Sequence, residues 1–149
     1  MAVLNPNNWH WVDKNTLPWT KEYFDENIKG LEIPSGASEC MYRIVEVSKV
    51  AGDSNVSQRK GKPICYFDLS VEFKLDVIPN ADDADKASGS ISLPEFMHDD
   101  PDFEIRTSGL SNELAGQVAR EFLPDFRKLL LEYQVDLLKT HSQDLQDSK

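Results

Sequence analysis

The sequence predicts an α+β protein with an N-terminal helix, a curved antiparallel meander of about four strands and a long C-terminal helix. Apolar residues recur at helical spacing near the start, alternate strictly between residues 65 and 77, and return to helical spacing in the last third. The helices are expected to pack on the sheet. The 149 residues suit one domain, with residues 1–15 extended and residues 79–90 forming a mobile acidic loop.

The first helix is expected within the segment TLPWTKEYFDENIKG, residues 16–30. Thr16 can cap its amino end, Pro18 suits its first turn, and Gly30 can end it. The residues that share its apolar face are Trp19, Tyr23, Phe24 and Ile28.

Two candidate strands follow this helix. Residues 41–52 are rich in β-branched side chains, which favour a strand. Residues 53–62 are polar, with Val56 as the apolar side chain to bury. They predict an edge-like strand that leads into a turn at Lys60-Gly61.

The clearest strand spans residues 65–77. Its alternating apolar positions are Cys65, Phe67, Leu69, Val71, Phe73, Leu75 and Val77. The positions between them are Tyr66, Asp68, Ser70, Glu72, Lys74 and Asp76. This pattern predicts a long antiparallel strand with one buried face and one face in water. A shorter strand is expected at residues 90–96, where Pro94 indicates a sheet edge.

The last third predicts a long helix with Ser111 as its cap. Its apolar stripe consists of Leu110, Leu114, Val118, Phe122, Phe126, Leu130, Tyr133 and Leu137, widened by Leu129 and Leu138. Pro124 lies inside this pattern and should kink the helix near Arg120, because proline cannot donate the backbone hydrogen bond there.

The charge of the chain disfavours nucleic acid as a partner. The net charge is −10, and it arises after Lys62, where eight Lys/Arg face eighteen Asp/Glu. Such a surface repels phosphate. No apolar run is long enough for a membrane span, so no membrane partner is expected. Cys40 and Cys65 lack metal-ligand spacing and the start lacks a signal-peptide pattern, so we expect reduced thiols and a cytoplasmic location.

The sequence carries no recognisable catalytic motif, and we expect neither an enzyme nor a cofactor. It lacks a nucleophile elbow, a phosphate-binding glycine loop and a paired-cysteine motif. His98, Asp99, Asp100 and Asp102 form a weak metal-binding pattern. A solvated acidic loop is about ten times as common a reason for such a pattern. No metal site is therefore expected.

A basic cluster, Arg59-Lys60-Gly61-Lys62, contrasts with the rest of this acidic chain. It is either a solvated turn or a recognition loop. The cluster precedes the strongest predicted strand, which would hold such a loop rigidly. Its natural partner is an acidic protein surface, with which it would associate rapidly and specifically.

The segments NPNNWHWVDKN, GDSNVSQRKGKPICYFDL and PEFMHD follow one another along the chain. Together they resemble the N-terminal domain of the activators of the ATPase of heat-shock protein ninety, over essentially the whole sequence. Larger members of this family carry a second, C-terminal domain. The chain looks like the small fungal members that consist of the N-terminal domain alone, and the resemblance therefore implies a weak activator.

The resemblance implies a monomeric regulator that performs no chemistry itself. In this family, the domain docks on the middle segment of the chaperone. There it remodels the catalytic loop whose arginine contacts the γ-phosphate of ATP. The expected chaperone-binding residues, matched one by one to the family motifs, are Asp53, Arg59, Lys60, Lys62 and Asp68.

The N-terminal segment NPNNWHW has two interpretations. The resemblance implies that it acts on nucleotide turnover by the chaperone, separately from docking, through Asn5, Asn7, Asn8, Trp9, His10 and Trp11. Alternatively, Trp9 and Trp11 fold back onto the core of the domain, because tryptophan is costly to leave in water. Both interpretations stay open.

A different class of protein shares the predicted architecture. Helices against a curved meander can also enclose a small hydrophobic ligand, and such a binder needs an unfilled interior. The aromatic residues expected to fill this interior, which favour the regulator, are Phe67, Phe73, Phe122, Phe126 and Tyr133.

Overall fold

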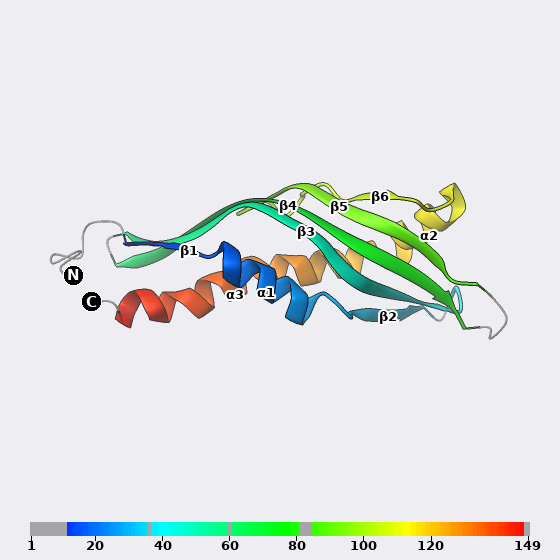
Figure 1. Cartoon of the computed structure of the whole chain (residues 1–149), viewed down its shortest axis with the longest axis horizontal. Coiled ribbons are helices and arrows are strands. Elements are labelled where there is room, and N and C mark those ends of the chain that lie inside the picture. Colours follow the sequence, from blue (N-terminus) through cyan, green and yellow to red (C-terminus); the bar gives the residue numbers. More distant parts are fainter. Residues whose placement is uncertain (1–11, 36, 60, 81–84, 148–149) are drawn as a thin grey trace.

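The computed structural model describes residues 12–35, 37–59, 61–80 and 85–147. The elements of the first half are β1 (Val12–Asn15), α1 (Leu17–Asn27), β2 (Glu32–Ser35), β3 (Cys40–Arg59) and β4 (Lys62–Pro79). Those of the second half are β5 (Ala87–Met97), β6 (Arg106–Ser108), α2 (Asn112–Glu121) and α3 (Leu123–Asp147). Figure 1 shows a long curved sheet with α1 and α3 beneath it.

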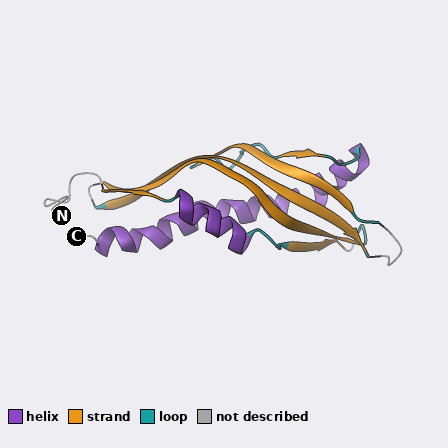
Figure 2. Ribbon diagram, in the orientation of Figure 1, coloured by secondary structure: helices purple, strands orange, loops and turns teal. Residues whose placement is uncertain are grey.

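The strands form one antiparallel sheet in the order β1-β3-β4-β5-β6, and β2 also pairs with β3. The helices α1 and α3 lie on one side of the sheet, so the predicted α+β class is confirmed (Figure 2). The described sheet has six strands where about four were expected. The additional strands include β1 and β2, short segments on either side of α1 that pair with opposite ends of β3.

The expectation of an edge-like strand at residues 53–62 is wrong. β3 runs without interruption from Cys40 to Arg59, with β1 on one side of its final part and β4 on the other. This segment is polar because, beside Val56, it buries hydrogen-bonding side chains. Ser54 and Gln58 are both buried, and Ser54 bonds other buried hydroxyls.

The helix ends differ from the expectations in two places. The side chain of Thr16 does not cap α1; the carboxamide oxygen of Asn15 accepts from the backbone N–H of Leu17 at 3.1 Å instead. The kink expected at Pro124 is an interruption at Phe122, which separates α2 from α3 while its backbone N–H still donates to the carbonyl of Val118. Ser111 caps α2 as predicted, accepting from the backbone N–H of Leu114 at 3.2 Å.

The loop expected at residues 79–90 is shorter, because β5 already begins at Ala87 and pairs with β4 there. Asp76 was expected in water, yet it is 6% exposed. Burial raises the pKa of its carboxyl, but the Ser88 hydroxyl at 2.7 Å and the Lys86 ammonium at 3.0 Å leave that pKa below its usual value. Lys86 and Ser88, near the start of β5, therefore offset the cost of burying the Asp76 carboxylate, which the sequence alternation predicts to be in water.

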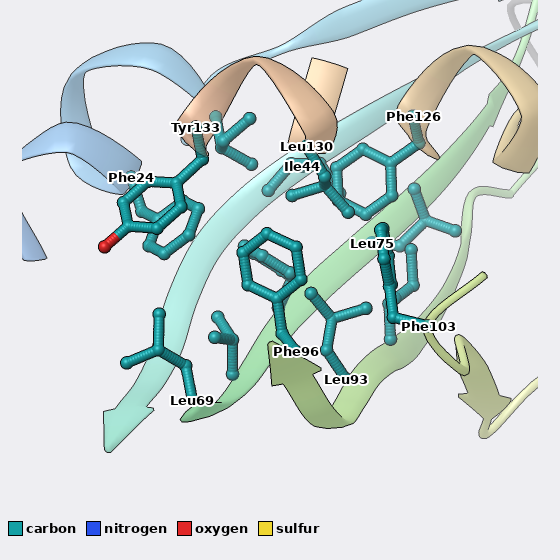
Figure 3. Close-up of a cluster of buried hydrophobic side chains, with 14 of the residues drawn as sticks. Phe24, Ile44, Leu69, Leu75, Leu93, Phe96, Phe103, Phe126, Leu130 and Tyr133 are labelled. Atoms are coloured by element: carbon teal, nitrogen blue, oxygen red, sulfur yellow. The ribbon is translucent and has the colours of Figure 1, made fainter. Parts of the chain in front are cut away.

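The core fills the space between the sheet and the helices. Figure 3 shows Phe24 and Tyr133, from α1 and α3, close to Phe96 from the sheet. The ring centroids of Phe24 and Tyr133 lie 5.3 Å apart, and those of Phe67 and Tyr133 lie 4.9 Å apart. The aromatic residues expected to fill the interior are all buried, whereas Leu129, expected to widen the apolar stripe, is 38% exposed. Such close ring packing leaves the hydrophobic-ligand alternative without support from the described core.

Candidate functional site

The basic turn lies at the tip of the hairpin that β3 and β4 form. β3 ends at Arg59, β4 begins at Lys62, and these two residues pair across the strands. Gly61 has a φ of 81°, a left-handed conformation that glycine adopts without steric cost. Lys62 is exposed. Lys60 and the side chain of Arg59 lie outside the described part of the structure.

Cross-strand pairing brings residues of both strands onto one face of this hairpin. The pairs are Asp53–Asp68, Asn55–Tyr66 and Ser57–Ile64. Intervening residues such as Val56 and Phe67 are buried on the side of the helices, so these pairs face away from the helices. We call the surface at Asp53, Asn55, Lys62, Ile64, Tyr66 and Asp68 the tip face. It contains the expected binding residues Asp53, Lys62 and Asp68.

Asp53 and Asp68 stand directly opposite each other, and both are exposed. Two like charges in this position weaken a sheet by about 0.2–1 kcal/mol. Further along the same strands the charges are complementary: Lys49 lies 3.8 Å from Glu72, and Lys74 lies 3.2 Å from Glu46. The Asp53–Asp68 pair therefore suits a cationic partner better than it suits the free protein.

Two apolar side chains lie between the charges of the tip face. Ile64 is 40% exposed and Tyr66 is 43% exposed. The Tyr66 ring packs against the imidazole of His98, with centroids 5.1 Å apart, which supports its orientation. Exposed apolar side chains inside a charged rim are the usual anatomy of a protein–protein interface.

Sequence reasoning did not single out Ile64 and Tyr66 as binding residues. The signal was present, because both occupy the solvent-facing positions of the alternation that β4 follows. An apolar residue in that register has no core to enter. The structure adds that β3 contributes Asp53 and Asn55 alongside them.

A network of buried hydroxyl groups lies next to the tip face, on the helix side of β3. The Tyr133 hydroxyl lies 2.6 Å from the Thr20 hydroxyl and 2.7 Å from the Ser54 hydroxyl, and Ser54 lies 2.8 Å from that of Thr16. These contacts join α1, β3 and α3 directly beneath Asp53. Burial raises the pKa of Tyr133, so its hydroxyl stays protonated and can donate at neutral pH. The network fixes the position from which the tip face projects.

The N-terminal segment joins the folded body beside the basic turn. Val12 of β1 pairs with Gln58, the residue before Arg59. The Ser57 hydroxyl donates to a carboxylate oxygen of Asp13, which holds β1 on β3. The motif residues Asn5, Asn7, Asn8, Trp9, His10 and Trp11 lie outside the described residues, so their role stays a prediction.

The residues of the weak metal-binding pattern, His98, Asp99, Asp100 and Asp102, make separate contacts. The Asp99 carboxylate accepts from the Gln134 amide at 2.7 Å, and Asp100 accepts from the backbone N–H of Asp102 at 3.0 Å. The His98 ring packs on Tyr66, and its Nδ1 lies 3.3 Å from the carbonyl oxygen of Phe67. Within the part of the chain that the structure describes, no group of three or more His, Cys, Asp or Glu could hold a metal ion.

Both cysteines are free thiols. Cys40 is buried, and burial raises the pKa of the half-buried Cys65 thiol to about 11. The thiolate is the reactive form, so Cys65 is a poor nucleophile at neutral pH. Neither residue is placed for covalent chemistry.

Comparison with known protein families places the chain in one of them. The profile described as "Activator of Hsp90 ATPase, N-terminal" matches residues 13–141. The chain belongs to this family. Its relatives include the Hsp90 co-chaperone HCH1 of Saccharomyces cerevisiae, which is 48% identical over 98% of this chain and 99% of its own length. The Hsp90 co-chaperone AHA1 of the same yeast is 39% identical, over 98% of this chain but 44% of AHA1.

Two solved structures of proteins named Aha-1 or Aha1 share the fold. The crystal structure of Aha-1 from Plasmodium falciparum matches with a TM-score of 0.75 and 23% identity, over 91% of this chain and 92% of that one. The solution structure of the human Aha1 N-terminal domain matches with a TM-score of 0.67 and 19% identity, over 89% and 99% of the two chains. Among the described residues, no helix is long and apolar enough to cross a membrane.

Proposed function

We propose that this protein is an Hsp90 co-chaperone that docks on the middle segment of the chaperone through its tip face. There it remodels the catalytic loop of the chaperone and so regulates the ATPase cycle. One observation carries the proposal. This protein, which is similar to HCH1 over nearly its whole length, exposes Ile64 and Tyr66 between residues of opposite charge. Lys62 provides the described cation, and Asp53 and Asp68 provide the carboxylates.

The charges of the tip face define the partner surface. Lys62 and its basic neighbours would face carboxylates, while Asp53 and Asp68 would face a lysine or an arginine. A cation of the partner between the two carboxylates removes their mutual repulsion. Docking would therefore relieve a charge repulsion that weakens the free protein. The pairing of opposite charges between the two proteins would also set the orientation of the complex.

The protein would act as a regulator, without supplying a reacting group to ATP hydrolysis. A bound regulator shifts a conformational equilibrium only by the difference between its affinities for the two states. A tenfold preference for the hydrolysing arrangement corresponds to about 1.4 kcal/mol. This chain spans 44% of AHA1, and we propose weak activation by the part that it covers. A monomeric state and a cytoplasmic location complete the proposal.

Titration calorimetry against the isolated middle segment tests the docking. Lys62→Glu should weaken binding about tenfold or more at low salt, with a smaller effect at high salt, because a screened attraction becomes a repulsion. Tyr66→Ala should weaken binding by about 1–2 kcal/mol with little salt dependence, because it removes an apolar anchor.

The matched controls are Lys29→Glu and Leu129→Ala, two exposed positions outside the tip face. Both controls should bind as the parent protein does. Parental affinity of Lys62→Glu and of Tyr66→Ala would overturn docking through this surface.

A further inference from the structure

The chain leaves β5 in a tight turn beside the tip face. β5 pairs with β4 as far as Met97, which lies opposite Asp68. The next residue, His98, still donates its backbone N–H to the carbonyl oxygen of Phe67 at 3.2 Å. Asp99 follows with a φ of +58°, a left-handed conformation that is less favourable for an aspartate than for a glycine. This conformation therefore depends on support from neighbouring groups.

The side-chain amide of Gln134, on α3, supplies this support. Its oxygen accepts from the backbone N–H of Asp99 at 2.8 Å, and its nitrogen donates to the Asp99 carboxylate at 2.7 Å. One planar amide thus binds both the backbone and the side chain of the same residue, which fixes the orientation of the turn. Two turns earlier on the same face of α3, Arg127 holds the following residues by donating to the carbonyls of Pro101 and Phe103, at 3.1 and 2.8 Å.

The same turn places the His98 ring against Tyr66. The two ring centroids lie 5.1 Å apart, and the His98 ring also lies 6.0 Å from that of Phe67. The pairing of β5 with β4 ends at Asp68, two residues away from Tyr66. On the other side, Tyr66 lies opposite Asn55 of β3. The His98 ring therefore takes the place that a β5 side chain would have beside Tyr66.

We propose that Gln134 is a positioning residue for docking. By fixing the turn at Asp99, it holds the His98 ring in place, and this ring keeps Tyr66 in one orientation on the tip face. This inference rests on the proposed function. Tyr66 is 43% exposed, so without a fixed neighbour its ring would adopt several rotamers in water. Docking would then have to restrict these rotamers, and the cost of doing so lowers the affinity.

A double-mutant cycle with Tyr66 tests this positioning role by titration calorimetry on the Hsp90 middle segment. Gln134→Ala should lower the affinity about three- to tenfold in the parent protein. It should lower the affinity by less than about twofold when Tyr66→Ala is already present, because its effect passes through that ring. Val135→Ala, at an exposed neighbouring position of α3, is the matched control and should bind as the parent does. An equal loss in both backgrounds, or no loss in either, would overturn the proposal.

An exchange of the amide and the carboxylate provides a rescue. Gln134→Glu sets two carboxylates against each other and should lower the affinity as Gln134→Ala does. Gln134→Glu combined with Asp99→Asn restores both hydrogen bonds, because the new amide donates to the new carboxylate, which also accepts from the backbone N–H of residue 99. This double variant has the net charge of the parent and should bind within about twofold of it. If it binds as weakly as Gln134→Glu alone, the Asp99 carboxylate acts by itself and the positioning role is wrong.

A measurement on the free protein separates this proposal from the proposed docking. In nuclear magnetic resonance spectra, Gln134→Ala should shift the aromatic resonances of Tyr66, because the His98 ring no longer lies at a fixed position beside them. The rescue variant should return these resonances to their parental positions. Unchanged Tyr66 resonances in Gln134→Ala overturn the positioning role, whatever the affinity. Parental binding of Tyr66→Ala to the middle segment overturns docking through the tip face instead.

Discussion

Two facing carboxylates of the tip face lower the stability of the free protein. Asp53 and Asp68 are directly paired in an otherwise complementary stretch of β3 and β4. Stability alone would favour Lys or Asn at one of these positions. Residues that weaken the fold and point into water are candidates for binding, because the complex can recover what the free state loses.

Asp68→Asn separates stability from docking. The substitution keeps the side-chain shape and removes the repulsion, so we expect the free energy of unfolding to rise by about 0.5 kcal/mol. Affinity for the Hsp90 middle segment should fall, because a charge that meets a partner cation is lost. Urea unfolding and calorimetry on the same sample provide both values. Asp102→Asn, an exposed control away from the tip face, should change neither.

Tyr133→Phe tests the hydroxyl network beneath this face. It removes one hydroxyl and leaves those of Thr20 and Ser54 with fewer partners in a dry site. We expect a loss of about 1–2 kcal/mol in the free energy of unfolding. Tyr66→Phe removes an exposed hydroxyl and should cost less than about 0.5 kcal/mol. Equal urea midpoints for the two variants would show that the network contributes no stability.

The β3–β4 hairpin is the element that carries the tip face, and Gly52 permits its close pairing. The φ of Gly52 is +116°, and a Cβ built there would lie 2.2 Å from the carbonyl oxygen of Asp68. No side chain fits such an approach without moving the backbone of β4. Gly61, at the turn, also has a positive φ of +81°, but a Cβ there would meet open space.

These two glycines make a matched pair of substitutions. Gly61→Ala should lower the free energy of unfolding by about 1 kcal/mol, because alanine must adopt the left-handed conformation there but meets no clash. Gly52→Ala should cost about 3 kcal/mol or more, because it adds a clash with β4. Denaturant unfolding of both variants gives the comparison. An equal cost at the two sites would contradict a close approach of the strands at Gly52.

The sequence predicts elements well where a single periodicity dominates. The alternation from Cys65 to Val77 correctly places Phe67 and Phe73 in the core, both at most 1% exposed. Sequence periodicity fails where buried polar side chains bond one another. Ser54 is predicted as a core residue only once the fold shows that its hydroxyl bonds that of Tyr133, which is far away in the sequence.

The same limit applies to the site. The family resemblance predicts Asp53, Lys62 and Asp68 as binding residues, and the register of β3 and β4 brings these three onto one face. The alternation along β4 places Ile64 and Tyr66 on the solvent-facing side, but the register with β3 is needed to show which charged residues surround them. Spacing along one strand does not show which neighbours leave an apolar side chain uncovered.

At the scale of the whole molecule, the described chain begins at the end that carries the basic turn. β1 pairs with the last residues of β3, and Val12 lies opposite Gln58. The body that carries the tip face consists of the sheet with α1 and α3, and its described core begins at Thr16. We therefore propose that the N-terminal motif, which lies outside the described residues, acts on the partner separately from docking.

Removing residues 1–11 tests whether docking and regulation are separable. The truncated chain retains β1 and the whole described core, so it should fold, with a modest loss of stability if a tryptophan of the segment packs on the body. The tip face is unchanged, so binding to the Hsp90 middle segment should be retained. Stimulation of ATP hydrolysis, or of nucleotide release, should fall well below that of the full chain, because the removed amides, imidazole and indoles make directional contacts. Binding and turnover are measured on one sample whose folding is verified by circular dichroism. A parallel fall in binding and turnover would make the segment a docking element, and failure to fold would make its tryptophans core residues.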